Sequence, residues 1–213
     1  MLQLRWHGHA CFEITNNTTL VTDPHDGRSI GIPTPTVQGD IILVSHNHYD
    51  HNSIKTVEKT SSKVITDERR RTIDNIEIKG FRVYHDKENG AKRGHNIMYK
   101  FTVDDISFLH LGDLGHELDE KIIKDIGDVD ILFIPVGGVF TIDGENAWRI
   151  INNIKPNIIV PMHYKIGGLS IPVQGIEQFL GRNPGVKVVK VGNEIDIEKE
   201  DMPKEQEIWV FTI

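Results

Sequence analysis

The amino-acid sequence predicts a single domain of the mixed α and β class, and two observations along the chain carry that prediction. The first half consists mostly of short apolar or alternating runs of strand length, bounded by Gly, Pro, Asn and Asp. In the second half, similar runs alternate with segments of helical periodicity. No internal repeat or long Gly/Ser linker divides the 213 residues, which suffice to bury one sizeable core. We therefore expect residues 1–213 to fold as one domain.

The first half is expected to form strands and one helix. Asn16-Asn17 and Asp104-Asp105 are short polar turns between strand pairs, as hairpins require. The expected helix is Ser53–Lys59, capped by Asn52 or Ser53. The expected strands are Leu2–Trp6, Cys11–Thr15, Thr19–Thr22, Ile41–Ser45, Lys63–Thr66, Phe81–Tyr84, Ile97–Val103 and Ile106–His110.

The second half is expected to alternate between helices and strands. In the segment Asp143–Ile154, apolar residues recur on one helical face and Asp143 can cap the first turn. The other expected helices are Leu118–Ile126 and Gln174–Leu180. The expected strands are Asp130–Pro135, Asn157–Val160, Val186–Val191 and Glu207–Thr212.

The charge balance argues against nucleic acid as a partner. Asp and Glu total 31 against 24 Lys and Arg, a formal net charge of -7, whereas surfaces that bind phosphate backbones are usually basic. The basic run Arg69-Arg70-Arg71 follows Asp67-Glu68 and precedes Asp74, so we expect a solvated, locally balanced surface there.

Cysteine usage and hydropathy predict a cytoplasmic protein that does not enter a membrane. Cys11 is the only cysteine, so no intramolecular disulfide can form, and its apolar neighbours predict a small core residue. The N-terminal residues lack a long apolar segment, and no run approaches the roughly 18 apolar residues of a membrane span. A homo-oligomer is compatible with these properties.

The segment His46-Asn47-His48-Tyr49-Asp50-His51 predicts a metal centre. It follows the apolar run Ile41–Ser45, so it lies where a buried strand ends and a loop begins. Neutral imidazole and ionised carboxylate are the ligands that Zn²⁺, Mn²⁺ and Fe²⁺ share, and four such groups rarely crowd together by chance. A tight turn at the mouth of a sheet could aim all four side chains inward.

This segment resembles the HxHxDH motif of the metallo-β-lactamase superfamily. Further motifs in the same order resemble the branch that contains L-ascorbate-6-phosphate lactonase and uncharacterised metal-dependent hydrolases. The resemblance covers nearly the whole chain and implies a four-layer αβ/βα sandwich of two mixed β-sheets flanked by helices. The further motifs are Gly8–Phe12, Val21–Pro24, Val83–Asp86, His110–Asp113, Pro135–Gly138 and Pro161–Lys165.

The resemblance also implies two metal ions and a ligand set for each. It assigns His46 and His48 to one ion, with His85 as the third histidine, and Asp50 and His51 to the second ion. Asp113 matches the aspartate that bridges the two ions, and Gly112 before it allows a sharp turn. His163 matches the final metal histidine. Asp23 matches an aspartate that orients the metal-binding loop without ligating.

Several histidines and loop residues have more than one candidate role. His95 and His110 compete with His85 for the third position, although His95 lies in a loop and His110 inside an apolar strand. His9 matches a histidine common in the branch and is expected to contact substrate. Further substrate contacts are expected at Arg93, Tyr164 and Lys165, and are conceivable at Asp143 and His116. Structural roles compete at each, since caps and loops use these residues routinely.

The predicted chemistry is hydrolysis by a hydroxide that bridges two divalent metal ions, zinc or manganese, with iron as the other candidate. Asp50 would orient the attacking water or accept its proton. We expect an ester, lactone or similar bond in a small molecule as the substrate. The alternatives are a phosphodiesterase or nuclease of the same superfamily, and a non-catalytic protein that binds a metal or a ligand. Specificity is expected to lie in the loops Pro24–Gly39, Lys87–His95 and Lys165–Pro172.

Overall fold

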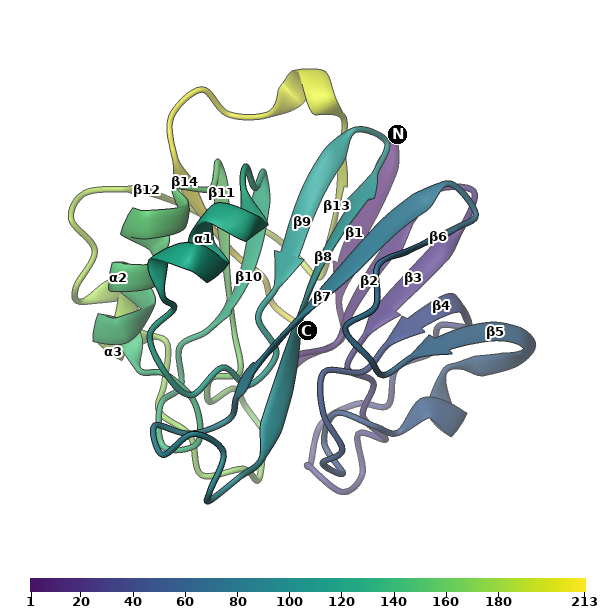
Figure 1. Ribbon diagram of the computed structural model, residues 1–213, viewed down its shortest axis with the longest axis horizontal. Coiled ribbons are helices and arrows are strands. Elements are labelled where there is room, and N and C mark those ends of the chain that lie inside the picture. The colour runs from purple at the N-terminus through teal and green to yellow at the C-terminus, as the bar shows by residue number, and fades with distance from the viewer.

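A computed structural model describes all 213 residues and shows two mixed β-sheets packed face to face (Figure 1). The smaller sheet has six strands in the order β13-β1-β2-β3-β4-β5, and the larger has eight in the order β12-β14-β11-β10-β9-β8-β7-β6. The smaller sheet contains β1 (Leu2–Trp6), β2 (Phe12–Thr15), β3 (Thr19–Thr22), β4 (Gly39–Leu43), β5 (Glu58–Ile65) and β13 (Glu194–Ile197).

The larger sheet combines an antiparallel half with a parallel half. Strands β6 to β9 pair antiparallel, whereas β9, β10, β11, β14 and β12 pair parallel. The strands are β6 (Arg71–Ile73), β7 (Ile76–Tyr84), β8 (His95–Val103), β9 (Ile106–His110), β10 (Ile131–Pro135), β11 (Ile158–Met162), β12 (Lys187–Lys190) and β14 (Glu207–Val210).

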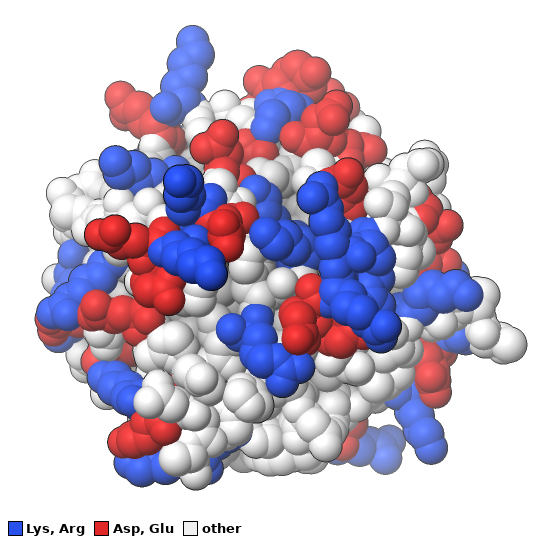
Figure 2. Space-filling view, viewed as in Figure 1, with Lys and Arg blue, Asp and Glu red and all other residues white.

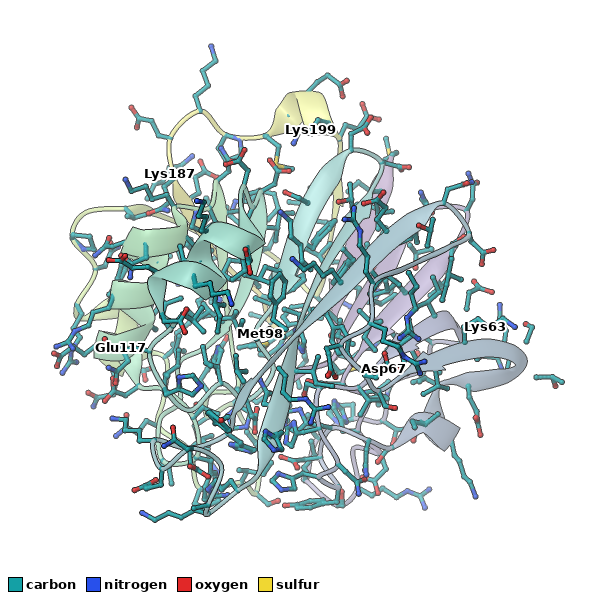
Figure 3. All side chains as sticks on the ribbon, in the orientation of Figure 1. Lys63, Asp67, Met98, Glu117, Lys187 and Lys199 are labelled. Atoms are coloured by element: carbon teal, nitrogen blue, oxygen red, sulfur yellow. The ribbon has the colours of Figure 1, made fainter.

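Apolar patterning explains which faces meet. In β1, Leu2, Leu4 and Trp6 are buried and alternate with half-buried residues, as expected of a strand with one face on a core. All five residues of β10 and of β11 are buried, as in parallel strands covered on both faces. A cluster of 47 buried apolar residues fills the space between the sheets and beneath the helices. Met98, which Figure 3 labels in the middle of the molecule, belongs to this cluster.

The three α-helices lie beside β10, β11 and β12 on one side of the molecule (Figure 1). They are α1 (Glu120–Ile126), α2 (Gly144–Ile154) and α3 (Glu177–Leu180). Asp143 caps α2 as predicted, because its carboxylate accepts hydrogen bonds from the backbone N–H groups of Glu145 and Asn146. Helix α2 connects the parallel strands β10 and β11, as such a crossover requires.

The smaller sheet is covered by loops instead of an α-helix. Its outward-facing residues Cys11, Val21 and Ile42 form a small buried cluster with Val37 and Ile54 of the adjoining segments. The buried position of Cys11 agrees with the prediction of a small core residue. The two mixed sheets with helices against the larger one are those of the predicted αβ/βα sandwich, but loops take the place of the predicted helical layer on the smaller sheet.

The predicted helix Ser53–Lys59 is wrong. Only a 3₁₀ turn forms, at Ile54–Thr56, and the chain then enters β5. Strand β5 begins earlier than the predicted Lys63–Thr66 and pairs in parallel with β4, where Ile41 aligns with Lys63. The hydrogen bonds that the edge of β4 offers outweigh the weak helix propensity of a segment rich in Thr, Ser and Val. The short edge strands β6 and β13 were also not predicted.

Charged side chains on the surface are largely mixed in sign. Arg69 and Arg71 pair with Asp67, and Arg70 pairs with Glu77, so the basic run is locally neutralised as predicted. Figure 2 shows Lys and Arg next to Asp and Glu across one face of the molecule. None of the helices combines the length and the apolar character needed to span a membrane.

Candidate metal centre

The predicted ligands follow strands that end at the same side of the molecule. Strands β3 and β4 run parallel, and so do β9, β10 and β11. Because β8 is antiparallel to both β7 and β9, β7 shares the direction of β9. The loops after these strands meet at the lower end of the view in Figure 1. Carboxyl ends of parallel strands are where open α/β sheets place their ligand sites. The residues there are Asp23, His46, His48, Asp50, His51, His85, Asp113 and His163.

Asp113 stands at the centre of this group. Its Oδ2 lies 3.1 Å from His85 Nε2, 3.2 Å from His163 Nε2 and 3.7 Å from His46 Nε2. Its Oδ1 lies 3.3 Å from His51 Nε2. One buried carboxylate thus faces histidines from both predicted ligand sets, as a bridging ligand would.

The remaining side chains fall into two groups on either side of Asp113. His46, His48 and His85 offer ring nitrogens within 4.8 Å of one another. Asp50, His51, His163 and also His9 offer a second set within the same limit. His85 therefore lies with His46 and His48, where the family pattern assigns it, and its role as a ligand remains a prediction.

Asp23 and Ser45 orient the rings of His46 and His51. Asp23 accepts hydrogen bonds from the N–H and the Oγ–H of Ser45, both at 2.7 Å, and from His51 Nδ1 at 3.1 Å. Since Ser45 Oγ donates to Asp23, it accepts the proton of His46 Nδ1, 2.8 Å away. Both rings then carry their proton on Nδ1 and turn Nε2 towards Asp113, which leaves that atom free to ligate.

The protonation states suit a metal centre. Burial, reinforced by the neighbouring His51, lowers the pKa of His46 to about 3, so the ring is neutral near pH 7. Although burial alone would raise the pKa of Asp113, the neighbouring His163 and His51 hold it well below its usual range. Neutral imidazole beside ionised carboxylate is the donor set that divalent cations require.

Two observations indicate that the site lacks positive charge and hydrogen-bond partners unless a cation binds. His46 Nε2 and Asp113 Oδ1 are buried and have no hydrogen-bond partner, and such atoms are rare in folded proteins. Burial favours neutral His51, but the carboxylates of Asp113 and Asp50 outweigh it and raise its pKa. The residues present therefore fit a divalent cation or a pair of them.

The backbone at the centre adopts unusual conformations. His9, Asp23 and His163 have φ values of 55°, 37° and 54° in the left-handed region, which residues other than glycine adopt rarely and at a cost of about 1–3 kcal/mol each. His163 N–H donates to His9 O at 3.1 Å, and this bond joins the loop before β2 to the loop after β11. Contacts between the sheets thus hold the strained residues in place.

A cavity of about 270 Å³ opens onto the predicted metal ligands. His48, Asp50, His85, Asp113 and His163 form its floor. Residues of two predicted specificity loops line it, namely Arg93 of Lys87–His95 and Ile171 and Pro172 of Lys165–Pro172, and the other lining residues are Tyr49 and Phe140. The loop Pro24–Gly39 does not reach the cavity, but its Ile30 and Ile32 pack behind Ile171. Sequence reasoning missed Tyr49 and Phe140, which no local pattern distinguishes.

Three of the predicted substrate contacts lie elsewhere. His9 is fully buried and its Nε2 lies 3.0 Å from Asp50 Oδ2, so it orients a predicted ligand or joins the second metal group. Tyr164 packs its ring against Trp6 and hydrogen-bonds Phe211 O, which places it in the core. The Lys165 ammonium turns back to the carbonyl oxygens of Leu169 and Ile171. Of these predictions, only Arg93 reaches the cavity.

The competing residues have structural surroundings. His110 donates its Nε2–H to Asp23 at 2.8 Å and lies in neither metal group. The exposed His95 packs near Tyr84, with 5.4 Å between ring centroids. His116 accepts a hydrogen bond from Tyr84 N–H at 3.1 Å, and Asp143 caps α2.

Comparisons with known proteins agree with this geometry. A family model described as a β-lactamase superfamily domain matches residues 3–163. A UPF0173 metal-dependent hydrolase of Thermoplasma acidophilum is 31% identical over 188 residues, 76% of this chain and 83% of that protein. Another from Thermococcus onnurineus is 24% identical over 224 residues, covering 92% and 100%.

A solved structure extends the similarity to the whole fold. A Thermotoga maritima protein assigned to the Zn-dependent hydrolases of the metallo-β-lactamase superfamily superimposes with a TM-score of 0.81 at 31% identity. The match covers 99% of this chain and 98% of that one. The two mixed sheets described above are therefore those of the metallo-β-lactamase fold.

We predict that His85→Ala removes roughly half of the bound metal, because a three-histidine site loses a ligand. His95→Ala is the matched control and should retain full metal content, since His95 lies in neither metal group. Elemental analysis of both purified variants measures the difference. A His95→Ala variant that loses its metal while His85→Ala keeps it would place the ligand in the other loop.

We predict that Gly112→Ala destabilises the fold by about 2–5 kcal/mol, the sum of a left-handed backbone and overpacking. Gly112 has φ 53°, and an added Cβ would lie 2.4 Å from Asn96 Oδ1 and 2.6 Å from Ser45 Cβ. Gly94→Ala is the control, because its φ is 81° but nothing lies within 4 Å. Urea denaturation should show the larger loss for Gly112→Ala, and equal losses would mean that close packing at Gly112 is unimportant.

Proposed function

The chain belongs to the β-lactamase superfamily as a metal-dependent hydrolase, and we propose that it cleaves an ester, lactone or similar bond in a small molecule. The proposed cofactors are two divalent ions, zinc or manganese, with iron as the other candidate, because sites with only nitrogen and oxygen ligands discriminate poorly among these metals. The type of bond and the number of ions both go beyond the family assignment.

The convergence of ligand-type side chains on Asp113 carries this proposal. Asp113 faces His46, His85, His51 and His163 within 3.7 Å. His46, His48 and His85 would hold one ion, and Asp50, His51 and His163 the other, with Asp113 between them. Bound metal ions would lower the pKa of a water molecule and polarise the bond to be cleaved.

The chain's own residues supply the rest of the chemistry. Asp50 lines the cavity. Burial alone would raise the pKa of Asp50, but the neighbouring His51 lowers it, so the Asp50 carboxylate is ionised. It can therefore hold a cation and orient a water by accepting a hydrogen bond from it. His9 Nε2 lies 3.0 Å from Asp50 Oδ2 and orients the Asp50 side chain. Asp23 and Ser45 keep the histidines of the loop in the tautomer that ligates.

The cavity supports a small molecule as the substrate. Its volume of about 270 Å³ accommodates a compact ligand. The net charge of -7 also disfavours nucleic acid. The cytoplasmic location and the homo-oligomer remain predictions of the sequence.

We predict that protein prepared without chelator and supplied with metal binds about two transition-metal ions per chain, as two-metal hydrolases do. The same preparation should hydrolyse members of a panel of chromogenic esters, lactones and phosphodiesters, and lose this activity on chelation. Elemental analysis measures the number of bound ions, and the panel of substrates measures the type of bond that is cleaved. Near-zero metal content would refute the dinuclear site, activity on phosphodiesters alone would favour the alternative class, and metal without any turnover would favour a binding protein.

We predict that Asp50→Asn folds, binds metal more weakly at the second site and loses at least about 100-fold in rate, the scale of an acid–base group. The change keeps the shape of the side chain and removes its charge. Rates should be measured at saturating metal, so that weaker binding does not account for the loss. Turnover close to wild type would transfer the proposed role to Asp113 or to a single-metal mechanism.

A further inference from the structure

We propose that the cavity selects substrates that carry an anionic group, carboxylate or phosphate, and that Arg93 binds this group. The inference rests on the proposed hydrolytic function and adds a substrate class to it. Arg93 is the only Lys or Arg among the residues that line the cavity and so carries its one permanent positive charge.

The Arg93 guanidinium has no carboxylate partner within the chain. Most other arginines of the protein are paired, and the carboxylates that hold them lie on the surface. Arg93 forms none of the ion pairs and none of the side-chain hydrogen bonds that the others make. Its guanidinium instead lies over the ring of Phe140, with the central carbon 4.3 Å from the ring centroid. Stacking of this kind holds the planar group while its N–H donors stay available for an anion.

Asp86 holds the loop that presents Arg93. Its Oδ1 accepts hydrogen bonds from the backbone N–H groups of Glu88 and Gly90 at 2.8 and 2.9 Å. Its Oδ2 accepts those of Lys92 and Arg93 at 3.0 and 2.7 Å. One carboxylate therefore fixes four backbone amides of an exposed loop, and this order reduces the entropy that binding must otherwise overcome. Asp86 is a positioning residue in this arrangement, because it does not line the cavity.

The apolar lining of the cavity fits the uncharged part of such a substrate. This lining consists of Phe140, Ile171 and Pro172. Ile171 and Phe140 are in turn supported by the buried cluster that contains Ile30 and Leu169. A ligand with one anionic end thus has a cation for that end, apolar contacts for its body and the metal ligands for its reacting bond. The occupied metal sites would add to the positive potential of the cavity in a chain of net charge -7.

Matched ligands test this inference without requiring turnover. Calorimetric titration of the metal-loaded protein compares hexanoate, adipate and 6-phosphonohexanoate, which share one carboxylate and differ at the other end. We expect the wild type to bind at least one of the two dianions about 10- to 100-fold more tightly than hexanoate, the range for a hydrogen bond between charged groups. Tighter binding of adipate identifies a carboxylate as the preferred group, and tighter binding of 6-phosphonohexanoate identifies a phosphate.

Variants assign the preference to Arg93. Arg93→Gln should abolish the difference between dianion and hexanoate while keeping metal content, and Arg93→Lys should restore it in part. Arg182→Gln is the matched control, since this exposed arginine does not line the cavity and bonds only Gln178 O. Asp86→Asn should reduce the preference at unchanged metal content, because it loses an acceptor for the Arg93 loop.

A kinetic pair, 4-nitrophenyl hydrogen adipate and 4-nitrophenyl hexanoate, extends the test to turnover. Arg93→Gln should lower kcat/KM about 10-fold or more for the adipate ester, mainly through KM, and less than about twofold for the hexanoate ester. Equal wild-type affinity for hexanoate and both dianions, or an unchanged preference in Arg93→Gln, would overturn the inference. If neither ester is hydrolysed but the binding preference depends on Arg93, the proposed bond type fails and the anion site stands.

Discussion

The rest of the site depends on the hydrogen bonds that the buried carboxylate of Asp23 accepts. Asp23 is fully buried and lies at the end of β3 in the smaller sheet, yet it accepts a hydrogen bond from His110 of β9 in the larger sheet at 2.8 Å. It also holds Ser45 and His51 of the predicted metal-binding loop. An ionised carboxylate tolerates burial only when donors surround it. The two sheets and the loop must therefore meet in one arrangement, and this arrangement aims the histidines at Asp113.

The same end of the molecule concentrates backbone strain and close packing. His9, Asp23 and His163 lie in the left-handed region, and a Cβ at Gly137 would come within 2.1 Å of His163 O. Tyr99 of β8 donates its hydroxyl to Val44 O at 3.0 Å and so ties the larger sheet to the segment that enters the metal-binding loop. The strained conformations persist because the surrounding sheets leave them few alternatives. Rigid support of this kind suits a centre whose geometry must not relax when a cation or a substrate binds.

In the proposed function, positioning of the metal ligands and selection of the substrate use different parts of the structure. The predicted ligands follow strands whose directions the sheets determine. Among the other cavity residues, Phe140 and Ile171 pack with a small apolar cluster of their own, and Asp86 holds the loop that carries Arg93. Loops can change without disturbing the strands beneath them. Relatives with the same fold can therefore share the metal chemistry and differ in the molecules they accept. In this chain, the residues that would discriminate between substrates are Arg93, Phe140 and Ile171.

Local patterns in the sequence determined the mixed α and β class, most strand positions and the dense motif His46–His51. The resemblance to the metallo-β-lactamase superfamily supplied the two mixed sheets and the other residues that gather around Asp113. Contacts distant in sequence could not be read in this way. Only the tertiary structure paired His110 with Asp23, placed His9 beside Asp50 and turned Tyr164 into the core. It also replaced the predicted helix Ser53–Lys59 by a turn and β5, because β4 offers an edge to pair with. Local patterns specify which side chains lie just after the end of a strand, whereas the packing of one sheet on the other decides which of these side chains meet.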